Sequence, residues 1–187
     1  MKSFLRPIIV SGLLLLVFGF GFPGLLWGVA RLLPQRAAGS PVVAGGRVVG
    51  FERIGQQFTQ ARYFWGRPSA VDYNAAATGA SNAGPSNPAL RAAVRARLDT
   101  FLLRNPGVTQ AQVPVELVTA SASGIDPDLS PAGAYVQVAR VARARHLPAA
   151  RVRQLVQQHI EQPWLGFMGP AHVSVLRLNL ALDALTR

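Results

Sequence analysis

The sequence predicts an α+β domain anchored by one N-terminal transmembrane helix. Three observations lead to this fold class: an uncharged apolar run near the start, three later segments with apolar residues at helical spacing, and short β-branched stretches. The stretches do not alternate regularly with the helical segments, which is typical of α+β folds rather than parallel α/β folds. We expect residues 1–33 to form a tail and the membrane helix, and residues 34–187 to form the domain.

The predicted anchor is residues 7–30, which carry no charged side chain between Arg6 and Arg31. At about 1.5 Å per helical residue this run can cross a hydrocarbon core of about 30 Å. Pro23 predicts a kink in its second half. The alternative is a signal peptide cleaved near residues 37–40, although the run is longer than the usual apolar region of about 7–15 residues.

Two glycines in this run, Gly24 and Gly28, have the spacing that lets membrane helices approach closely. A chance pair in a glycine-rich segment is the alternative. Residues 19–24 also match G-x-G-x-x-G, but a dinucleotide site needs that string between a strand and a helix, not at bilayer depth.

The domain is predicted to begin with a hairpin, in which Val42-Val43 and Val48-Val49 flank a glycine pair. Residues 66–88 are rich in Gly, Pro, Ser and Asn and predict a long ordered loop. Asn87 then serves as the N-cap of a helix that begins at Pro88 and ends near Asn105.

Two more helices follow in the prediction. One begins at Ser130-Pro131, and one begins at Pro148 and ends before Pro163. Residues 113–118 and 173–178 are β-branched or alternate in polarity, and we expect both to be strands. Residues 179–185 favour a helix.

The composition excludes several kinds of chemistry. The 187 residues include no cysteine, and Lys2 is the only lysine, so thiol nucleophiles, disulfides, cysteine-bound metals and a P-loop lysine are excluded. Serine, aspartate and histidine candidates for a hydrolase exist, but none forms a G-x-S-x-G elbow. They are Ser121, Ser123, Asp126, His146, His159 and His172. We predict no enzyme activity and no metal site, because the histidines lack ligand spacing.

Charge leaves another class open, a membrane-anchored binding module whose Arg-rich face meets anionic lipid or nucleic acid. The net charge is +11, and residues 34–187 carry 16 Arg and 8 acidic residues, a net +8. Arg91 with Arg95, and Arg140 with Arg143, are spaced to share helix faces that could neutralise phosphates. Solvated surface faces are the alternative.

Six blocks of sequence are similar to one known family. They are residues 57–59, 63–70, 81–88, 114–127, 140–145 and 178–183, the longest reading Pro-Val-Glu-Leu-Val-Thr-Ala-Ser-Ala-Ser-Gly-Ile-Asp-Pro. In this order behind one membrane helix, the chain resembles the C subunit (KdpC) of the bacterial high-affinity potassium-transporting P-type ATPase. The resemblance covers nearly the whole chain.

The resemblance implies a non-catalytic accessory subunit of an ATP-driven potassium uptake complex. Such a subunit would assemble or stabilise a channel-like potassium-binding subunit and a P-type ATP-hydrolysing subunit. It would also act as a catalytic chaperone that promotes ATP binding by the latter, with no cofactor held firmly and no nucleic acid bound. The family lies in the bacterial inner membrane with one pass, a cytoplasmic N-terminus and an extracytoplasmic domain.

The family also suggests site residues. Gln137 matches a polar residue nominated for nucleotide contact. A helix-surface amide is the alternative, because cytosolic ATP would lie across the bilayer from this domain. Asp128 departs from the family pattern, since many members carry His there.

The remaining candidate residues are polar groups in loops. Thr119, Ser121, Ser123 and Asp126 can hydrogen-bond their own backbone and fix an irregular turn. The loop residues Asn82, Ser86 and Asn87 could do the same or touch a partner. The acidic residues Glu116, Asp126 and Asp128 could line a potassium access path, with capping and loop hydrogen bonds as the alternative.

Overall fold

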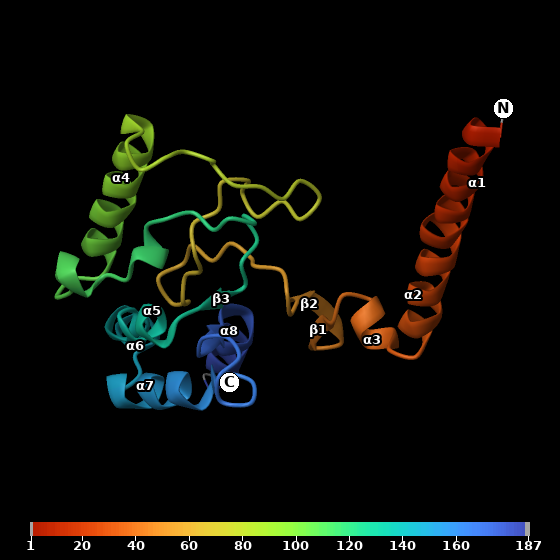
Figure 1. Ribbon diagram of the computed structural model, residues 1–187. Coiled ribbons are helices and arrows are strands. Elements are labelled where there is room, and N and C mark those ends of the chain that lie inside the picture. The colour runs from red at the N-terminus through yellow and green to blue at the C-terminus, as the bar shows by residue number, and fades with distance from the viewer. Residues whose placement is uncertain (1, 186–187) are drawn as a thin grey trace. The chain divides into compact units, whose positions relative to one another are not determined.

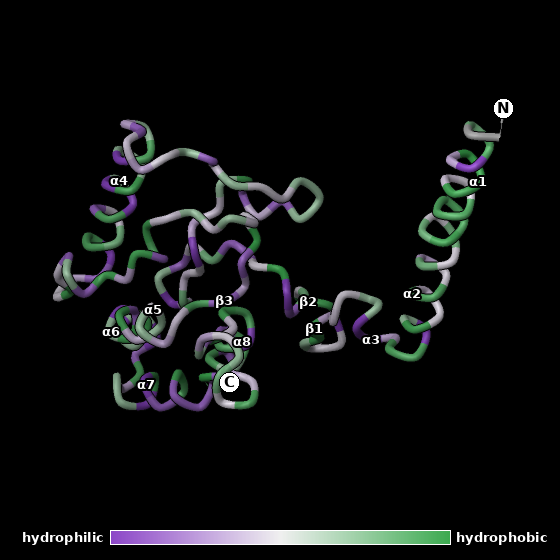
Figure 2. The backbone as a smooth tube through the Cα atoms, in the orientation of Figure 1, coloured by the Kyte–Doolittle hydropathy of each residue, from purple (hydrophilic) through white to green (hydrophobic). Residues whose placement is uncertain are grey.

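A computed structural model describes residues 2–185, in two compact units that meet between Pro41 and Val42. The first unit holds helix α1 (Lys2–Leu16), a π-helical turn η1 (Val17–Gly21), helix α2 (Phe22–Arg31) and the short helix α3 (Pro34–Ala37). Phe4–Arg31 is the one described helix that is long and apolar enough to cross a membrane. Apolar residues run along most of its length (Figure 2).

The irregular part of this helix lies just before the predicted kink at Pro23. Phe22 N–H bonds the carbonyl of Val17, five residues back, which marks the wider π turn. Pro23 has no N–H to donate to the carbonyl four residues earlier, so the regular ladder is interrupted at this point.

The predicted hairpin is confirmed as strands β1 (Pro41–Ala44) and β2 (Arg47–Phe51). Gly45 and Gly46 join them with φ of 57° and 75°. Positive φ at both turn positions matches the twist of the flanking strands, and glycine adopts it without a steric penalty.

The predicted loop is confirmed too, since residues 66–87 form neither helix nor strand. Helix α4 (Pro88–Arg104) follows, and the Asn87 side chain caps it by accepting the Ala89 N–H at 2.8 Å. Leu98 and Phe101 are the residues that α4 buries.

The strand predicted at residues 113–118 is wrong. Two 3-10 turns stand there, η2 (Gln110–Gln112) and η3 (Val115–Leu117). Pro114 has no N–H for a ladder, and its carbonyl instead accepts the Leu117 N–H at 3.0 Å. Local bonds therefore replace cross-strand pairing.

The second predicted helix is divided into α5 (Pro131–Tyr135) and α6 (Val138–Arg145), with Gln137 at the junction. The third is α7 (Ala149–Gln158), which packs against α5, α6 and the C-terminal helix α8 (Val175–Ala184). Figure 1 shows these four helices gathered together.

A small antiparallel sheet lies beside these helices, in the order β3 (Asp128–Leu129), β5 (His172–Ser174), β4 (Ile160–Glu161). The prediction of a strand over residues 173–178 is wrong from Val175 onward, where α8 begins. Val175, Leu178 and Leu182 are buried at helical spacing, so this face drives helix formation. The helix expected after residue 178 is confirmed as part of α8.

One hydrophobic core lies in the second unit, and it draws on α4 to α8, η3, β3, β5 and the segment just before the long loop. Its largest fully buried members are Phe64, Leu129, Leu178, Leu182, Val141, Val152, Val156 and Val173. The mixture of helices and small sheets agrees with the predicted α+β class.

Candidate functional site

Three buried polar side chains hold residues 61–65, the segment just before the long loop, against the helices. We call Gln137, Arg140 and Asn179 the polar clasp. Asn179 accepts the Phe64 N–H at 2.8 Å and donates to the Phe64 carbonyl at 3.0 Å. Gln137 does the same for Trp65, at 2.9 and 3.0 Å. Each carboxamide thus satisfies a backbone donor and acceptor that a neighbouring strand would otherwise pair.

The carboxamide of Gln137 is saturated. Besides Trp65, its nitrogen donates to the Gly133 carbonyl at 3.0 Å and its oxygen accepts from Arg140 Nη2 at 2.6 Å. Two donors and two lone pairs are all that this group has. The side chain is 0% exposed, so the alternative of a helix-surface amide is wrong.

Arg140 completes the clasp from helix α6. Its Nη1 donates to the carbonyls of Ala61 and Tyr63 at 2.6 and 2.9 Å, and its Nε donates to Asn105 Oδ1 at 3.0 Å. The guanidinium also lies 3.9 Å from the Trp65 ring centre, a cation–π contact. Burial lowers the pKa of Arg140 to about 10, which leaves it protonated at neutral pH.

The predicted Arg140–Arg143 surface face is therefore wrong. Arg140 is 4% exposed and Arg143 is exposed. The loop carbonyls at Ala61 and Tyr63 need donors, and Arg140 turns inward to supply them. On α4, Arg91 and Arg95 are exposed as predicted, and Arg95 pairs with Asp99 four residues on.

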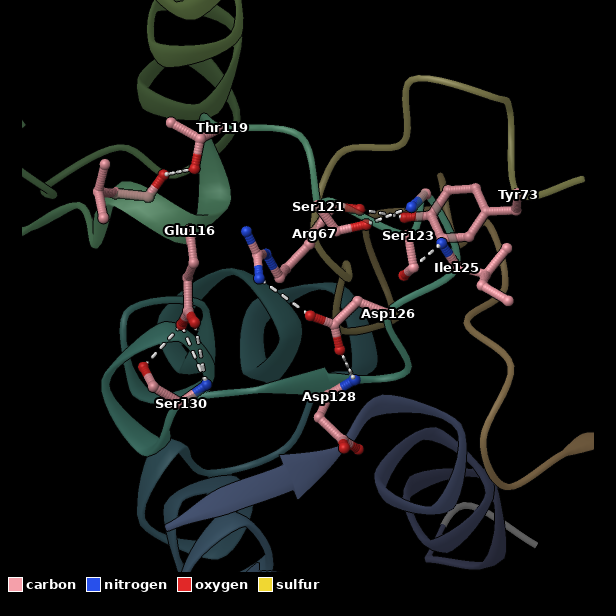
Figure 3. Close-up of polar contacts among 12 residues, drawn as sticks. Arg67, Tyr73, Glu116, Thr119, Ser121, Ser123, Ile125, Asp126, Asp128 and Ser130 are labelled. Atoms are coloured by element: carbon pink, nitrogen blue, oxygen red, sulfur yellow. Dashed lines mark hydrogen bonds and ion pairs between the residues drawn. The ribbon is translucent and has the colours of Figure 1, made fainter. Parts of the chain in front are cut away.

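The predicted irregular turn is built from local side-chain bonds (Figure 3). Thr119 Oγ1 donates to the Val115 carbonyl at 2.8 Å. The other three candidate side chains accept backbone N–H groups, Ser121 from Gly124, Ser123 from Ile125 and Asp126 from Asp128. The hydrogen bonding expected from the sequence is thus observed, whereas any partner contact by these residues stays a prediction.

This turn also fastens the long loop. Asp126 pairs with Arg67 at 2.9 Å, and Ser69 Oγ donates to the Gly124 carbonyl at 2.6 Å. Tyr73 donates its hydroxyl to the Arg67 carbonyl. Burial, and then the charge of Asp126, raise the pKa of Tyr73 above its ordinary value of 10.0.

The acidic candidates are mostly engaged in capping. Glu116 accepts the Ser130 N–H and hydroxyl at 3.0 and 2.6 Å, and Ser130 in turn caps α5 through the Gly133 N–H. Asp128 lies 3.9 Å from His172 Nε2. Burial raises the pKa of Asp128, and the nearby carboxylates of Asp126 and Glu161 add to this against the opposing charge of His172. A potassium path along these residues stays a prediction.

The other candidates lie apart from the clasp and the turn. Asn82, with φ of 52°, and Ser86 are exposed in the loop before α4. An added Cβ at Gly24 or Gly28 would meet nothing within 4 Å, so both present an open helix surface. Within residues 2–185, no group of three or more His, Cys, Asp and Glu side chains could hold a metal ion.

Sequence reasoning missed Asn179, although a signal for it exists. It lies on the apolar stripe of α8, four residues after Val175 and three before Leu182. A polar residue inside such a stripe must find buried partners, which in this fold are the N–H and carbonyl of Phe64.

These features define a class of protein: an apolar helix long enough to cross a membrane, joined to an α+β domain with a buried polar clasp. The family model of the "K+-transporting ATPase, c chain" matches residues 4–184. The KdpC subunit of the potassium-transporting ATPase of Polaromonas naphthalenivorans is 55% identical, over 99% of this chain and 96% of that protein. The corresponding subunits of Variovorax paradoxus (50%; 98% and 97%) and Nitratidesulfovibrio vulgaris (52%; 99% and 96%) are similar. The chain belongs to the KdpC family of potassium-transporting ATPase subunits.

Proposed function

We propose that the chain is a non-catalytic accessory subunit of an ATP-driven potassium uptake complex. It assembles or stabilises a channel-like subunit that binds potassium and a P-type subunit that hydrolyses ATP. The observation that carries this proposal is the family match over residues 4–184, which includes both the apolar helix and the domain.

The state of the polar residues supports a structural role. Ser121, Ser123 and Asp126, the serine and aspartate candidates for a hydrolase, are engaged in bonds to the chain's own backbone. Gln137 and Arg140 hold the backbone of Trp65 and Tyr63. These bonds make the domain rigid, and an assembly subunit needs rigidity more than it needs reactive groups.

We place the N-terminus in the cytoplasm of a bacterial cell and the domain outside the inner membrane, as in the family. Because the chain has no cysteine, a single engineered one reports the side directly. With Leu103→Cys, a membrane-impermeant maleimide should label spheroplasts without lysis. Labelling that requires lysis would contradict this topology.

Promotion of ATP binding by the hydrolysing subunit is, in this proposal, an indirect effect of assembly. What supports an indirect route is the saturation of Gln137, whose four hydrogen-bonding positions are all occupied within the fold. Direct nucleotide contact at Gln137 would require those bonds to open.

Co-purification tests the proposed assembly. The tagged full chain is extracted in mild detergent and mixed with the purified channel-like and ATP-hydrolysing subunits of a potassium-transporting ATPase. It should retain both subunits through size-exclusion chromatography. The matched control is the same chain with residues 4–31 replaced by the membrane helix of an unrelated protein. Elution of the chain alone, with its domain folded, would refute the assembly role.

A further inference from the structure

The loop between β4 and β5 carries an exposed cluster of large apolar side chains. We call residues 164–168 the apolar tip. Trp164, Leu165, Phe167 and Met168 are 69%, 66%, 77% and 47% exposed. Soluble surfaces carry scattered apolar residues, but several large ones in one turn are typical of an interaction site.

The apolar tip is an ordered turn. Trp164 and Met168 exchange backbone hydrogen bonds of 3.0 and 2.9 Å. Leu165 has a φ of 54°, a left-handed conformation that is unfavourable for a leucine. Since its exposed side chain gains little from the fold itself, strain at this position points to a contact made outside the chain.

Beside the apolar tip lies a cleft of about 730 Å³. Trp164 and Met168 are among the residues that line it, together with Arg67 and His172. Its lining also includes half of the eight acidic residues in the sequence: Glu116, Asp126, Asp128 and Glu161. Two of these are already engaged, Glu116 by Ser130 and Asp126 by Arg67. The other two, Asp128 and Glu161, both face the imidazole of His172, at 3.9 and 3.7 Å.

We infer that the apolar tip and this cleft dock a segment of another subunit of the complex, one in which an Arg or Lys is flanked by apolar residues. This inference rests on the proposed function and names its contact surface. The apolar side chains would supply a buried centre, the usual anchor of an interface. The basic side chain would neutralise Asp128 and Glu161, where the otherwise basic domain presents negative charge.

The charge also distinguishes a protein partner from a lipid surface. Bacterial and other anionic membrane surfaces attract basic segments and repel acidic ones. An apolar tip seated beside Asp128 and Glu161 is therefore better suited to a basic protein segment than to a bilayer.

Cysteine protection tests this surface. We would place Phe167→Cys in the full chain and measure its maleimide labelling rate in three settings: alone in detergent, alone in liposomes, and in the assembled complex. Phe167 is largely exposed, so the change should leave the fold intact. The rate should fall at least about tenfold in the complex only. Leu103→Cys, an exposed apolar position on α4, is the matched control for reagent access.

A second variant tests the energetics. Phe167→Asp should weaken retention of the chain by the complex at least about tenfold, and Leu103→Asp should not. Equal labelling of Phe167→Cys alone and in an intact complex would overturn the inference while leaving the proposed function standing. Equal protection in empty liposomes would assign the apolar tip to lipid instead and also overturn it. A chain that never joins the complex would remove the proposed function and this inference together.

Discussion

Replacing Gln137 by leucine tests whether the polar clasp stabilises the domain. The leucine fills a similar volume but leaves four groups without their partner: the Trp65 N–H, the Trp65 and Gly133 carbonyls, and one Arg140 N–H. Three of the lost bonds are neutral, at about 1 kcal/mol each, and the bond from Arg140 is charge-assisted, at about 1.5–3 kcal/mol.

Water can replace part of this loss. Trp65 is only half-buried, so its backbone groups can be partly rehydrated, whereas Gly133 is buried. We therefore expect the free energy of unfolding to fall by about 3 kcal/mol in Gln137→Leu. For a domain of this size that corresponds to a drop in Tm of roughly 6–12 °C.

The assay is thermal unfolding of the full chain in detergent, followed by near-UV circular dichroism. Gln154→Leu is the matched control, because Gln154 is an exposed amide on α7, and we expect it to change stability by less than about 0.5 kcal/mol. A Tm for Gln137→Leu within about 2 °C of the unmodified chain would refute the reasoning. If ATP affinity of the assembled complex fell without any loss of Tm, Gln137 would act on nucleotide rather than on the fold.

Three further predictions concern the turn and the loop. Gly124→Ala should destabilise the domain by roughly 2–4 kcal/mol in a urea titration, because φ is 73° and a Cβ would lie 2.4 Å from the Val71 side chain. Gly84 has open space around it, so Gly84→Ala should be nearly neutral in the same titration. Above pH 10.0 the unfolded chain should lose the Tyr73 proton before the folded chain does, so the free energy of unfolding should fall as pH rises. If the free energy of unfolding of Tyr73→Phe fell by the same amount over this pH range, the result would contradict this prediction. Glu116→Gln should cost about 1–2 kcal/mol by weakening the bonds to Ser130, and an unchanged urea midpoint would count against the capping role.

Elements with local signals could be predicted from the sequence. Gly45-Gly46 fixes the hairpin turn, and Asn87-Pro88 fixes the start of α4, because each signal acts within a few residues. The bonds of Thr119 and Ser121 are local in the same way.

The remaining features depend on partners far away in the sequence. Asn179 and Phe64 are 115 residues apart, and Arg140 meets the Tyr63 carbonyl across 77 residues. No local pattern specifies such pairs, and helical spacing alone therefore predicts Arg140 on a surface face. Strands β3 and β4 have two residues each, too few for alternation to be recognised.

Residues 173–178 illustrate an ambiguity of period. Val173 and Val175 alternate as in a strand, while Val175, Leu178 and Leu182 recur as in a helix. The fold resolves the conflict at Ser174, because β3 pairs with β5 only as far as that residue. Beyond Ser174 the chain gains more free energy by burying the apolar face of helix α8 than by extending the strand.

The most direct test of the accessory role is potassium-dependent ATP hydrolysis by the purified transport complex, measured with this chain omitted and then added back. We predict that omission abolishes potassium-stimulated hydrolysis and that the full chain restores it, with a lower KM for ATP. A complex that assembles and hydrolyses ATP at its full rate without the chain would contradict the account.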